Sequence, residues 1–271
     1  MSEAAAWASR IILGTMRMHE KGSSEEWARL LGYAWDRGVR KLHSSAEYES
    51  FKFFREVLAI LRVKRPAIAF RHVVKLAEPS FGEERFDAER FRERVSVYRR
   101  DLDVDRIDTI QWMWRHDLED ETRRLAALNA AWPEISATVA ALKNEGQIGE
   151  FCCFPYSVGF AEAAARSVVV DGLIVYLNRI ERDYAVIAAD AAQRGLSVDA
   201  IRPFAAGKAM EQSGVGAPAL LDELLGDGSV RGAILSVSNQ HQLDALLRIQ
   251  PINALRNDSI IGANSSGSAA W

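Results

Sequence analysis

The chain has 271 residues, 48% of them hydrophobic and 26% charged, which is typical of a globular protein with one large domain or two small ones. Its formal net charge is −3, so it lacks the basic field that carries binding to nucleic acids or anionic membranes. The N-terminus has no signal-peptide pattern, and no later stretch reads as apolar for long enough to span a bilayer. We therefore expect a cytoplasmic protein with neither kind of partner; no oligomeric state is indicated.

Short strand-like runs alternate with amphipathic helical stretches along the whole chain. Strands are predicted near 11–14, 40–44, 68–75, 107–113, 148–154, 171–177, 197–201 and 231–236. Helices are predicted near 24–36, 48–62, 87–101, 133–145, 159–166, 183–193, 217–225 and 239–248. This pattern predicts a single (β/α)8 barrel over 1–271, with a doubly wound sheet as the alternative. A weakly ordered tail is expected over 258–271, where 264–270 is rich in serine and alanine.

Local signals support these boundaries. The run Ser23-Ser24-Glu25-Glu26 is typical of a helix N-cap, and Gly38, Gly146 and Gly195 follow predicted helices at the C′ position. The two cysteines, Cys152 and Cys153, are adjacent in an apolar run, which favours buried thiols over a disulfide framework. The five histidines are isolated, so no metal site is predicted.

Two polar residues follow the second and third predicted strands. Tyr48 ends the polar cluster after the second strand, and Lys75 ends the third. The carboxyl ends of barrel strands open on one face, so these side chains are expected to lie close together. An ammonium group can lower the pKa of a nearby phenol, which would make Tyr48 a proton donor to a carbonyl oxygen.

Several motifs recur in the order found in the aldo-keto reductase superfamily of NADP-dependent barrel enzymes. The chain resembles this superfamily at Ile11–Met16 (first strand), Gly38–Tyr48 ("GxxxxDTAxxYG"), Lys75 (strand-3 lysine), Leu102–Asp108 ("LgtdyiDl"), Leu142–Ile148 ("LkeeGKir") and Ser236–Leu243 ("GxsxpeqL", which grips phosphate). The resemblance implies a (β/α)8 barrel, the cofactor NADP(H) and hydride transfer to a carbonyl.

The chain departs from the superfamily at its chemical positions. The aspartate that pairs with the lysine is His43 here, and the strand-4 histidine falls near Met113 or Trp114. The strand-5 "SN" that holds the nicotinamide carboxamide corresponds to Phe154-Pro155. The strand-6 glutamine corresponds to Ile174 or, in a shifted register, Asn178. Two of the four catalytic positions are therefore kept, and the nicotinamide clamp is lost.

Other polar and aromatic residues are candidates for the missing roles. His43 could orient Lys75, share a proton with Tyr48 or contact an anionic substrate; the alternative is a satisfied, half-buried histidine. His116 is a displaced proton donor or, with Arg115, a clasp for a phosphate or carboxylate; the alternative is a solvated loop ion pair. We expect one indole of Trp112 and Trp114 to face the barrel mouth and stack on a ring-shaped substrate, and the other to lie in the core.

The exits of the last two strands are candidates for cofactor binding, because barrels commonly bind phosphate there. The side chains proposed to contact NADP(H) are Ser236, Ser238, Asn239, Gln242, Phe204 and Lys208. Lys208 would replace the basic residue that usually reads the 2′-phosphate, whereas Asn239 could equally be an ordinary helix cap.

Two functions remain open. The first is an aldo-keto-reductase-like oxidoreductase that transfers hydride between NADP(H) and a polar carbonyl or sugar-type substrate. The second is a redox-inactive barrel of the same fold, acting as a cofactor-independent lyase or isomerase or as a binding protein. The altered residues at strands 5 and 6 favour the second, and the strand-8 segment favours the first.

Overall fold

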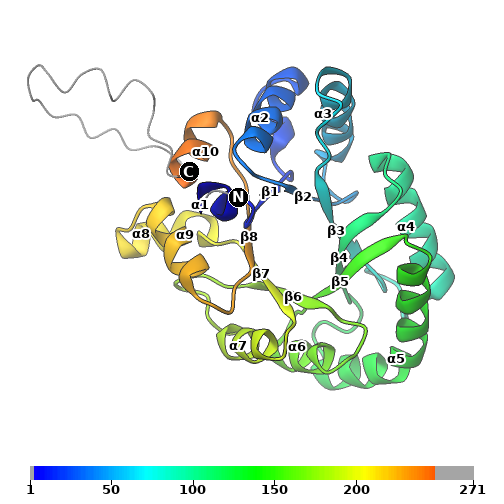
Figure 1. Ribbon diagram of the computed structural model, residues 1–271. Coiled ribbons are helices and arrows are strands. Elements are labelled where there is room, and N and C mark those ends of the chain that lie inside the picture. The colour runs from blue at the N-terminus through cyan, green and yellow to red at the C-terminus, as the bar shows by residue number, and fades with distance from the viewer. Residues whose placement is uncertain (1–2, 248–271) are drawn as a thin grey trace, which may run out of the picture.

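A computed structural model describes residues 3–247 and shows a closed barrel of eight parallel strands surrounded by helices (Figure 1). The strands lie in chain order, and β8 pairs with β1 to close the sheet. They are β1 (Ile11–Gly14), β2 (Lys41–Ser44), β3 (Arg71–Ala77), β4 (Ile107–Met113), β5 (Ile148–Phe154), β6 (Gly172–Tyr176), β7 (Ser197–Ile201) and β8 (Gly232–Leu235). The predicted (β/α)8 barrel is confirmed; the predicted weakly ordered tail lies outside the described residues.

Eight helices follow the eight strands and form the outer ring (Figure 1). They are α2 (Ser24–Asp36), α3 (Phe51–Lys64), α4 (Ala88–Leu102), α5 (Glu121–Asn144), α6 (Val158–Ala165), α7 (Ala185–Gln193), α9 (Ala217–Gly226) and α10 (Gln240–Leu246). Four short elements were not predicted: α1 (Glu3–Ala8), η1 (Met18–Glu20), η2 (Ala205–Gly207) and α8 (Lys208–Ser213). They are short enough that their sequences carry no helical period.

Helix α5 begins twelve residues earlier than predicted, at Glu121 instead of residue 133. Pro133 reads as the first residue of a helix, but here it lies in the helix interior. Among the described residues, α5 is also the one helix long and apolar enough to cross a membrane, contrary to the expectation of none. Its Leu128, Ile135 and Leu142 are fully buried in the main hydrophobic core, as in an outer helix of a barrel.

The predicted N-cap at Ser23 and the predicted C′ glycines are confirmed by the hydrogen bonds and the backbone angles. Ser23 accepts from the Glu26 backbone N–H, and the Glu26 carboxylate accepts from the Ser23 N–H at 2.7 Å, which together form a capping box. Gly38, Gly146 and Gly195 have φ of 100°, 69° and 84°, the left-handed conformation that ends a helix at low cost.

The strands bury side chains on both faces. Outward-facing residues pack against the helices, and a second cluster that includes Ile12, Val73, Cys152 and Ile234 fills the barrel interior. Cys153, the neighbour of Cys152 on β5, packs on the helix side. Both thiols are free, and burial raises their pKa well above the usual value, so they are unreactive packing residues.

An ion-pair network lies below this interior cluster, toward the N-terminal ends of the strands. Arg231, just before β8, donates to Asp199 on β7 at 2.6 Å and to Glu150 on β5 at 2.6 Å. Glu150 also accepts from Thr109 on β4 at 3.1 Å. Asp199 is 1% exposed, so its carboxylate depends on Arg231 for compensation.

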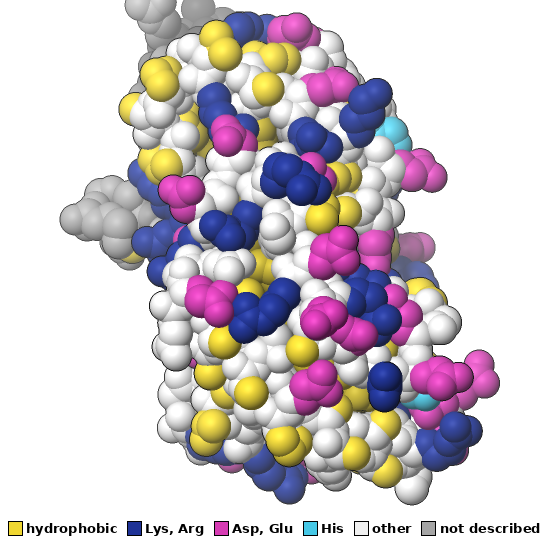
Figure 2. All heavy atoms as spheres, turned by 90° about the vertical axis from the view of Figure 1, so that its right-hand side faces the viewer, with side chains coloured by type: hydrophobic (Ala, Val, Ile, Leu, Met, Phe, Trp, Pro, Cys, Tyr) yellow, Lys and Arg dark blue, Asp and Glu magenta, His cyan; other side chains and the backbone are white. Residues whose placement is uncertain are grey.

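The surface over α3, α4 and α5 carries both signs of charge. Figure 2 shows Lys and Arg side chains interspersed with Asp and Glu side chains on this face. The face has no extended field of one sign of the kind that a nucleic acid or an anionic membrane would need.

Candidate active site at the carboxyl ends of the strands

A cavity of about 1220 Å³ opens at the carboxyl ends of the strands. One end is lined by residues of β2, β3 and β4, and the other lies between the β7 and β8 exits and the η1–α2 segment. The lining includes His43, Tyr48, Lys75, Gln111, Met113, Phe154, Tyr176, Phe204, Ser236, Ser238, Asn239 and Gln242. The predicted catalytic and cofactor-binding segments therefore share one continuous space.

Tyr48 is held at the cavity wall by a turn and by a tyrosine of α4. The Tyr48 N–H donates to the Ser45 carbonyl at 3.1 Å, which closes the turn after β2. The Tyr98 hydroxyl accepts from the Ala46 N–H at 2.7 Å and donates to the Lys75 carbonyl at 2.9 Å. Tyr98 thus connects the Tyr48 turn to the end of β3 that carries Lys75.

The Lys75 ammonium lies over the aromatic face of Tyr48. Its Nζ is 5.2 Å from the ring centroid, within the range of a cation–π contact. Burial raises the pKa of the Tyr48 phenol above its usual value, and the Glu47 carboxylate adds to this rise. The pKa is therefore raised and not lowered as predicted, because the desolvation of the ring and the neighbouring carboxylate outweigh the opposing charge of Arg115.

His43 is a buried, neutral partner of Gln111. Its Nε2 donates to Gln111 Oε1 at 2.7 Å, which places the ring proton on Nε2. Burial lowers the pKa of His43 to about 4, and the charge on Lys75 acts in the same direction, although the hydrogen bond to Gln111 opposes both. His43 is therefore buried and hydrogen-bonded, although it also lines the cavity, and Gln111 is a cavity residue that the sequence did not single out.

Glu47 is a second residue that the sequence analysis missed. Its Oε2 lies 3.0 Å from Lys75 Nζ and accepts from Arg115 Nη2 at 2.8 Å, while Oε1 accepts from Arg115 Nη1. Burial acts to raise the pKa of Glu47, but the hydrogen bonds from Arg115 and Lys75 prevail and leave it below its usual value. The carboxylate is therefore ionised at neutral pH.

Arg115 and His116 have separate partners and do not form a clasp. Arg115 is buried, bonds Glu47, and donates to the Tyr156 hydroxyl at 3.2 Å. His116 lies outside the cavity lining, with Nε2 3.0 Å from Asp117 Oδ2. Within residues 3–247, no group of three or more His, Cys, Asp or Glu side chains is placed to hold a metal ion.

Neither tryptophan of β4 reaches the cavity. Trp112 and Trp114 are 0% and 1% exposed, and both pack against Phe160 of α6. Strict alternation along β4 turns Gln111 and Met113 inward and both indoles outward. The prediction that one indole faces the mouth is therefore wrong, and Met113 is the inward residue at the end of β4.

Aromatic side chains form the cavity wall at the ends of β5 and β6. Phe154 and Tyr176 meet edge to face, with ring centroids 5.2 Å apart. Ile174 lies deeper, in the interior cluster, and Asn178 donates to Glu181 and to the Arg202 carbonyl within the loop after β6. Neither residue that the resemblance aligned with the strand-6 glutamine lines the cavity, which Tyr176 reaches instead.

The far end of the cavity mixes hydroxyl and cationic groups. Ser236, Ser238 and Asn239 line it, and Asn239 also caps α10 by accepting from the Gln242 N–H at 2.9 Å. Lys208 does not line the cavity. The cations that do so at this end are Arg17, Lys21 and Arg29, from the η1–α2 segment, and Arg202, at the β7 exit.

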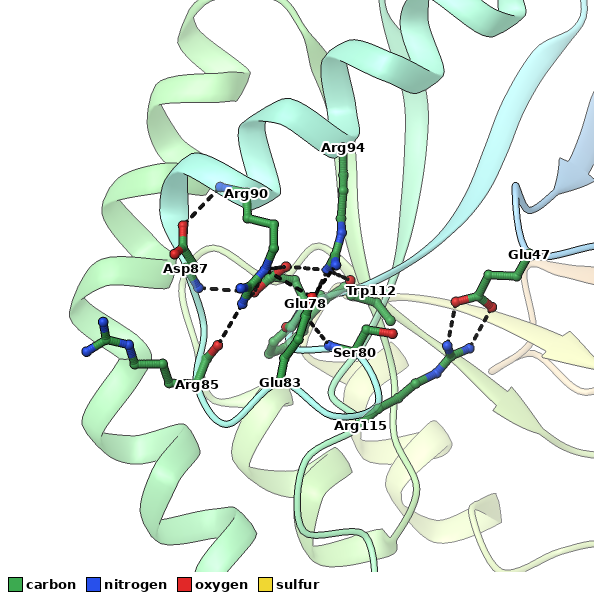
Figure 3. A network of polar contacts seen from close by, with 11 residues as sticks. Glu47, Glu78, Ser80, Glu83, Arg85, Asp87, Arg90, Arg94, Trp112 and Arg115 are labelled. Atoms are coloured by element: carbon green, nitrogen blue, oxygen red, sulfur yellow. Dashed lines mark hydrogen bonds and ion pairs between the residues drawn. The ribbon is translucent and has the colours of Figure 1, made fainter.

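A polar network fixes the loop between β3 and α4, beside Arg115 (Figure 3). Glu78 is fully buried and pairs with Arg90 at 2.6 Å and with Arg94. Glu83 pairs with both arginines and accepts from the Ser80 N–H at 2.6 Å. At the loop tip, Phe81 is 67% exposed, and its ring centroid lies 4.7 Å from the Arg115 guanidinium carbon.

Comparison with known proteins agrees with this architecture. The family model described as the aldo/keto reductase family matches residues 10–216. Two solved structures described as a "putative aldo-keto reductase" from Pseudomonas aeruginosa are 23% identical to this chain, with TM-scores of 0.68 and 0.67. Each alignment covers 89% of this chain and 89% or 90% of the other, and at this identity the likeness shows the fold. No curated protein matches the chain.

Proposed function

Because this chain belongs to the aldo/keto reductase family, we propose that it is an oxidoreductase that transfers hydride between NADP(H) and a polar carbonyl compound. The observation that carries the proposal is the continuous cavity, which joins Tyr48 and Lys75 to the β8 exit. Ordinary small-molecule pockets measure about 300–1,000 Å³. At about 1220 Å³, this cavity has room for a dinucleotide and a small substrate together.

The residues at the far end of the cavity suit the phosphates of NADP(H). Ser236 and Ser238 offer hydroxyl groups, and Arg17, Lys21 and Arg29 offer positive charge. Lys208 is not required for this role. These three cations come from the β1 side of the cavity, a place that the sequence analysis did not consider.

The nicotinamide end of the cavity fits the cofactor less well. Phe154 and Tyr176 offer aromatic surface and no carboxamide partner. The amide at this end belongs to Gln111, whose Oε1 is occupied by His43. We propose that Gln111 Nε2 donates to a carbonyl oxygen in the cavity, either of the cofactor or of the substrate.

NADP(H), when bound, supplies or accepts the hydride. Tyr48 stays protonated near neutral pH, because burial raises its pKa, and it donates its proton to the carbonyl oxygen as negative charge develops there. An alkoxide is a much stronger base than a phenolate, so this transfer remains favourable. Lys75 stabilises the same developing charge as a fixed cation. His43, which is neutral, and His116, which lies outside the cavity, are assigned no proton transfer.

In the second candidate function, the barrel is the same but no hydride is transferred. The aromatic wall of Phe154 and Tyr176 favours it, because this wall occupies the place where the superfamily clamps the nicotinamide. In that case Tyr48 and Lys75 would bind or polarise an oxygen of a ligand in a cofactor-independent lyase, isomerase or binding protein. The cavity lining combines Lys75, Gln111 and the serines of the β8 exit, so either function implies a polar, oxygen-rich ligand. A cytoplasmic location would suit both, since the two cysteines are free.

Titration with NADPH and NADH, followed by tryptophan fluorescence, tests the proposal. Trp27 lines the cavity and is expected to respond to bound nicotinamide. Ser238→Ala should weaken NADPH binding by about 1.5–3 kcal/mol if its hydroxyl bonds a phosphate. Asn239→Ala should add a loss of helix capping, so the single Ser238 variant is the cleaner test.

The matched control is Ser229→Ala, in the loop before β8 on the opposite face, which should bind NADPH like the unmutated protein. An unmutated protein that binds neither nucleotide would reject the reductase and favour the second candidate. Binding that Ser238→Ala leaves unchanged would place the phosphates elsewhere.

A further inference from the structure

Lys75 requires a counter-charge that the end of β2 does not supply. Its side chain is 18% exposed, and an ammonium group buried to this degree is costly unless it is paired. His43 occupies the inward position at the end of β2 and is neutral at pH 7, with its Nε2 proton directed to Gln111. It therefore leaves the charge on Lys75 uncompensated.

We infer that Glu47 is the positioning residue of this site, which holds the Lys75 ammonium over the Tyr48 ring in place of an acid at position 43. The Glu47 carboxylate lies 3.0 Å from Lys75 Nζ. It comes directly before Tyr48 in the chain, so the same turn carries the proton donor and the group that places the cation. The inference deepens the proposed function and rests on it only for the catalytic consequence.

Arg115 makes this arrangement rigid. Its guanidinium holds both Glu47 oxygens, and its own side chain is only 6% exposed. Arg115 is fixed in turn by the Tyr156 hydroxyl and by the Phe81 ring. A bidentate arginine–carboxylate pair allows little rotation, so Glu47 presents Oε2 to Lys75 in one geometry.

The geometry determines what Lys75 can do. An ammonium group has three donors, and one of them serves Glu47. The others can reach a ligand oxygen in the cavity beside Tyr48. Without Glu47, Lys75 and Arg115 would repel each other, and the lysine would leave the ring.

The position of Lys75 can be measured without cofactor or substrate. Lysines are reductively methylated with ¹³C-formaldehyde, which keeps their charge, and the Lys75 signal is assigned with Lys75→Arg. In the unmutated protein, the Tyr48 ring should displace this signal upfield, and Tyr48→Leu should abolish the displacement. Glu47→Gln should also abolish it, while Glu47→Asp should restore part of it.

Glu49→Gln is the matched control, because Glu49 lies two residues away with its side chain 91% exposed, and its substitution should leave the Lys75 signal unchanged. A Lys75 signal that keeps its upfield displacement in folded Glu47→Gln protein would overturn the inference. If Glu47→Gln does not fold, the Glu47→Asp signal decides: a shift identical to that of the unmutated protein would contradict positioning by an oxygen at 3.0 Å.

Catalysis gives a second readout. Misplacement of a catalytic group by about 1 Å can cost about 10²-fold in rate, so Glu47→Gln should lower kcat by about that factor, with NADPH affinity retained. Failure of the unmutated protein to bind NADPH would reject the reductase but leave the lysine measurement valid. The two proposals can therefore fail separately.

Discussion

Tyr48 carries the chemistry in either candidate enzyme, and its environment differs from what its neighbours in the sequence suggest. The phenol shares the cavity with Lys75, yet the ammonium contacts the ring face, and burial keeps the pKa above the ordinary value of 10.0. The hydroxyl is therefore protonated over the whole range in which the protein would work.

Tyr48→Phe keeps the ring and its packing and removes only the proton. General acid catalysis contributes roughly 10²–10⁴-fold, so turnover should fall by about that factor with little change in stability. In the unmutated enzyme, the pH profile of kcat/KM should show no loss of activity due to Tyr48 below about pH 10, because its pKa is raised. Near-normal turnover of Tyr48→Phe would remove Tyr48 from the mechanism. Lys75→Arg would then be the variant that decides whether this part of the cavity is the catalytic site.

At the scale of secondary-structure elements, the ion-pair network at the N-terminal ends of the strands depends on one cation. Arg231 joins Asp199 and Glu150, and the hydrogen bonds to these carboxylates raise its pKa although burial opposes the rise. Arg231→Met should cost about 3–5 kcal/mol of the free energy of unfolding, because it leaves the buried Asp199 without a partner.

Urea unfolding measures this loss. The double variant Arg231→Met/Asp199→Asn should recover part of it, since it removes the unpaired charge as well. A single variant within about 1 kcal/mol of the unmutated protein would show that Asp199 is compensated elsewhere.

The sequence predicts the eight strands and the eight outer helices of the barrel well, because the signals for these elements are local. Hydrophobic periods, the Ser23 cap and the glycines after the helices are all properties of neighbouring residues. The exception, α5, turns on Pro133, where the packing of the earlier helical turns prevails over a local preference. The inward ends of β2 and β3 were likewise predictable from strand alternation, and both His43 and Lys75 line the cavity.

The partners within the site were not predictable in this way. Glu47 pairs with Lys75 and Arg115, which lie 28 and 68 positions later in the chain, and no local pattern encodes such a choice. The indoles of Trp112 and Trp114 suggested a ligand platform, but the layer between β4 and α6 is deep enough to bury both. Side-chain composition indicated which chemical groups are present, whereas the fold determined which face they occupy.

At the scale of the whole molecule, two buried histidines couple stability to pH. Burial lowers the pKa of both His43 and His72 from 6.5 to about 4, and the Nδ1 of His72 has no hydrogen-bond partner. Between about pH 4 and pH 6.5, the two histidines bind protons in the unfolded chain that they do not bind in the folded protein. Stability is therefore fully present above about pH 6.5 and falls as the pH drops toward 4.

Each unit of pKa difference corresponds to about 1.4 kcal/mol, so the free energy of unfolding should decrease by several kcal/mol over this window. His72→Leu should remove about half of that pH dependence, and the exposed His241→Asn should leave it intact. Urea unfolding at pH 7.5 and at pH 5 makes the comparison. If the free energy of unfolding falls between pH 7.5 and pH 5 by the same amount in His72→Leu and in the unmutated protein, His72 is protonated in the folded state at pH 5.

The loop between β3 and α4 has a base fixed by ion pairs and an exposed tip. Its base is tied by Glu78 and Glu83 to Arg90 and Arg94 (Figure 3). Its tip carries the exposed Phe81, whose ring contacts the Arg115 guanidinium. The ion pairs of the base hold the loop without any contribution from Phe81. An exchange of the tip residue should therefore affect the Arg115–Glu47 pair before it affects the stability of the barrel.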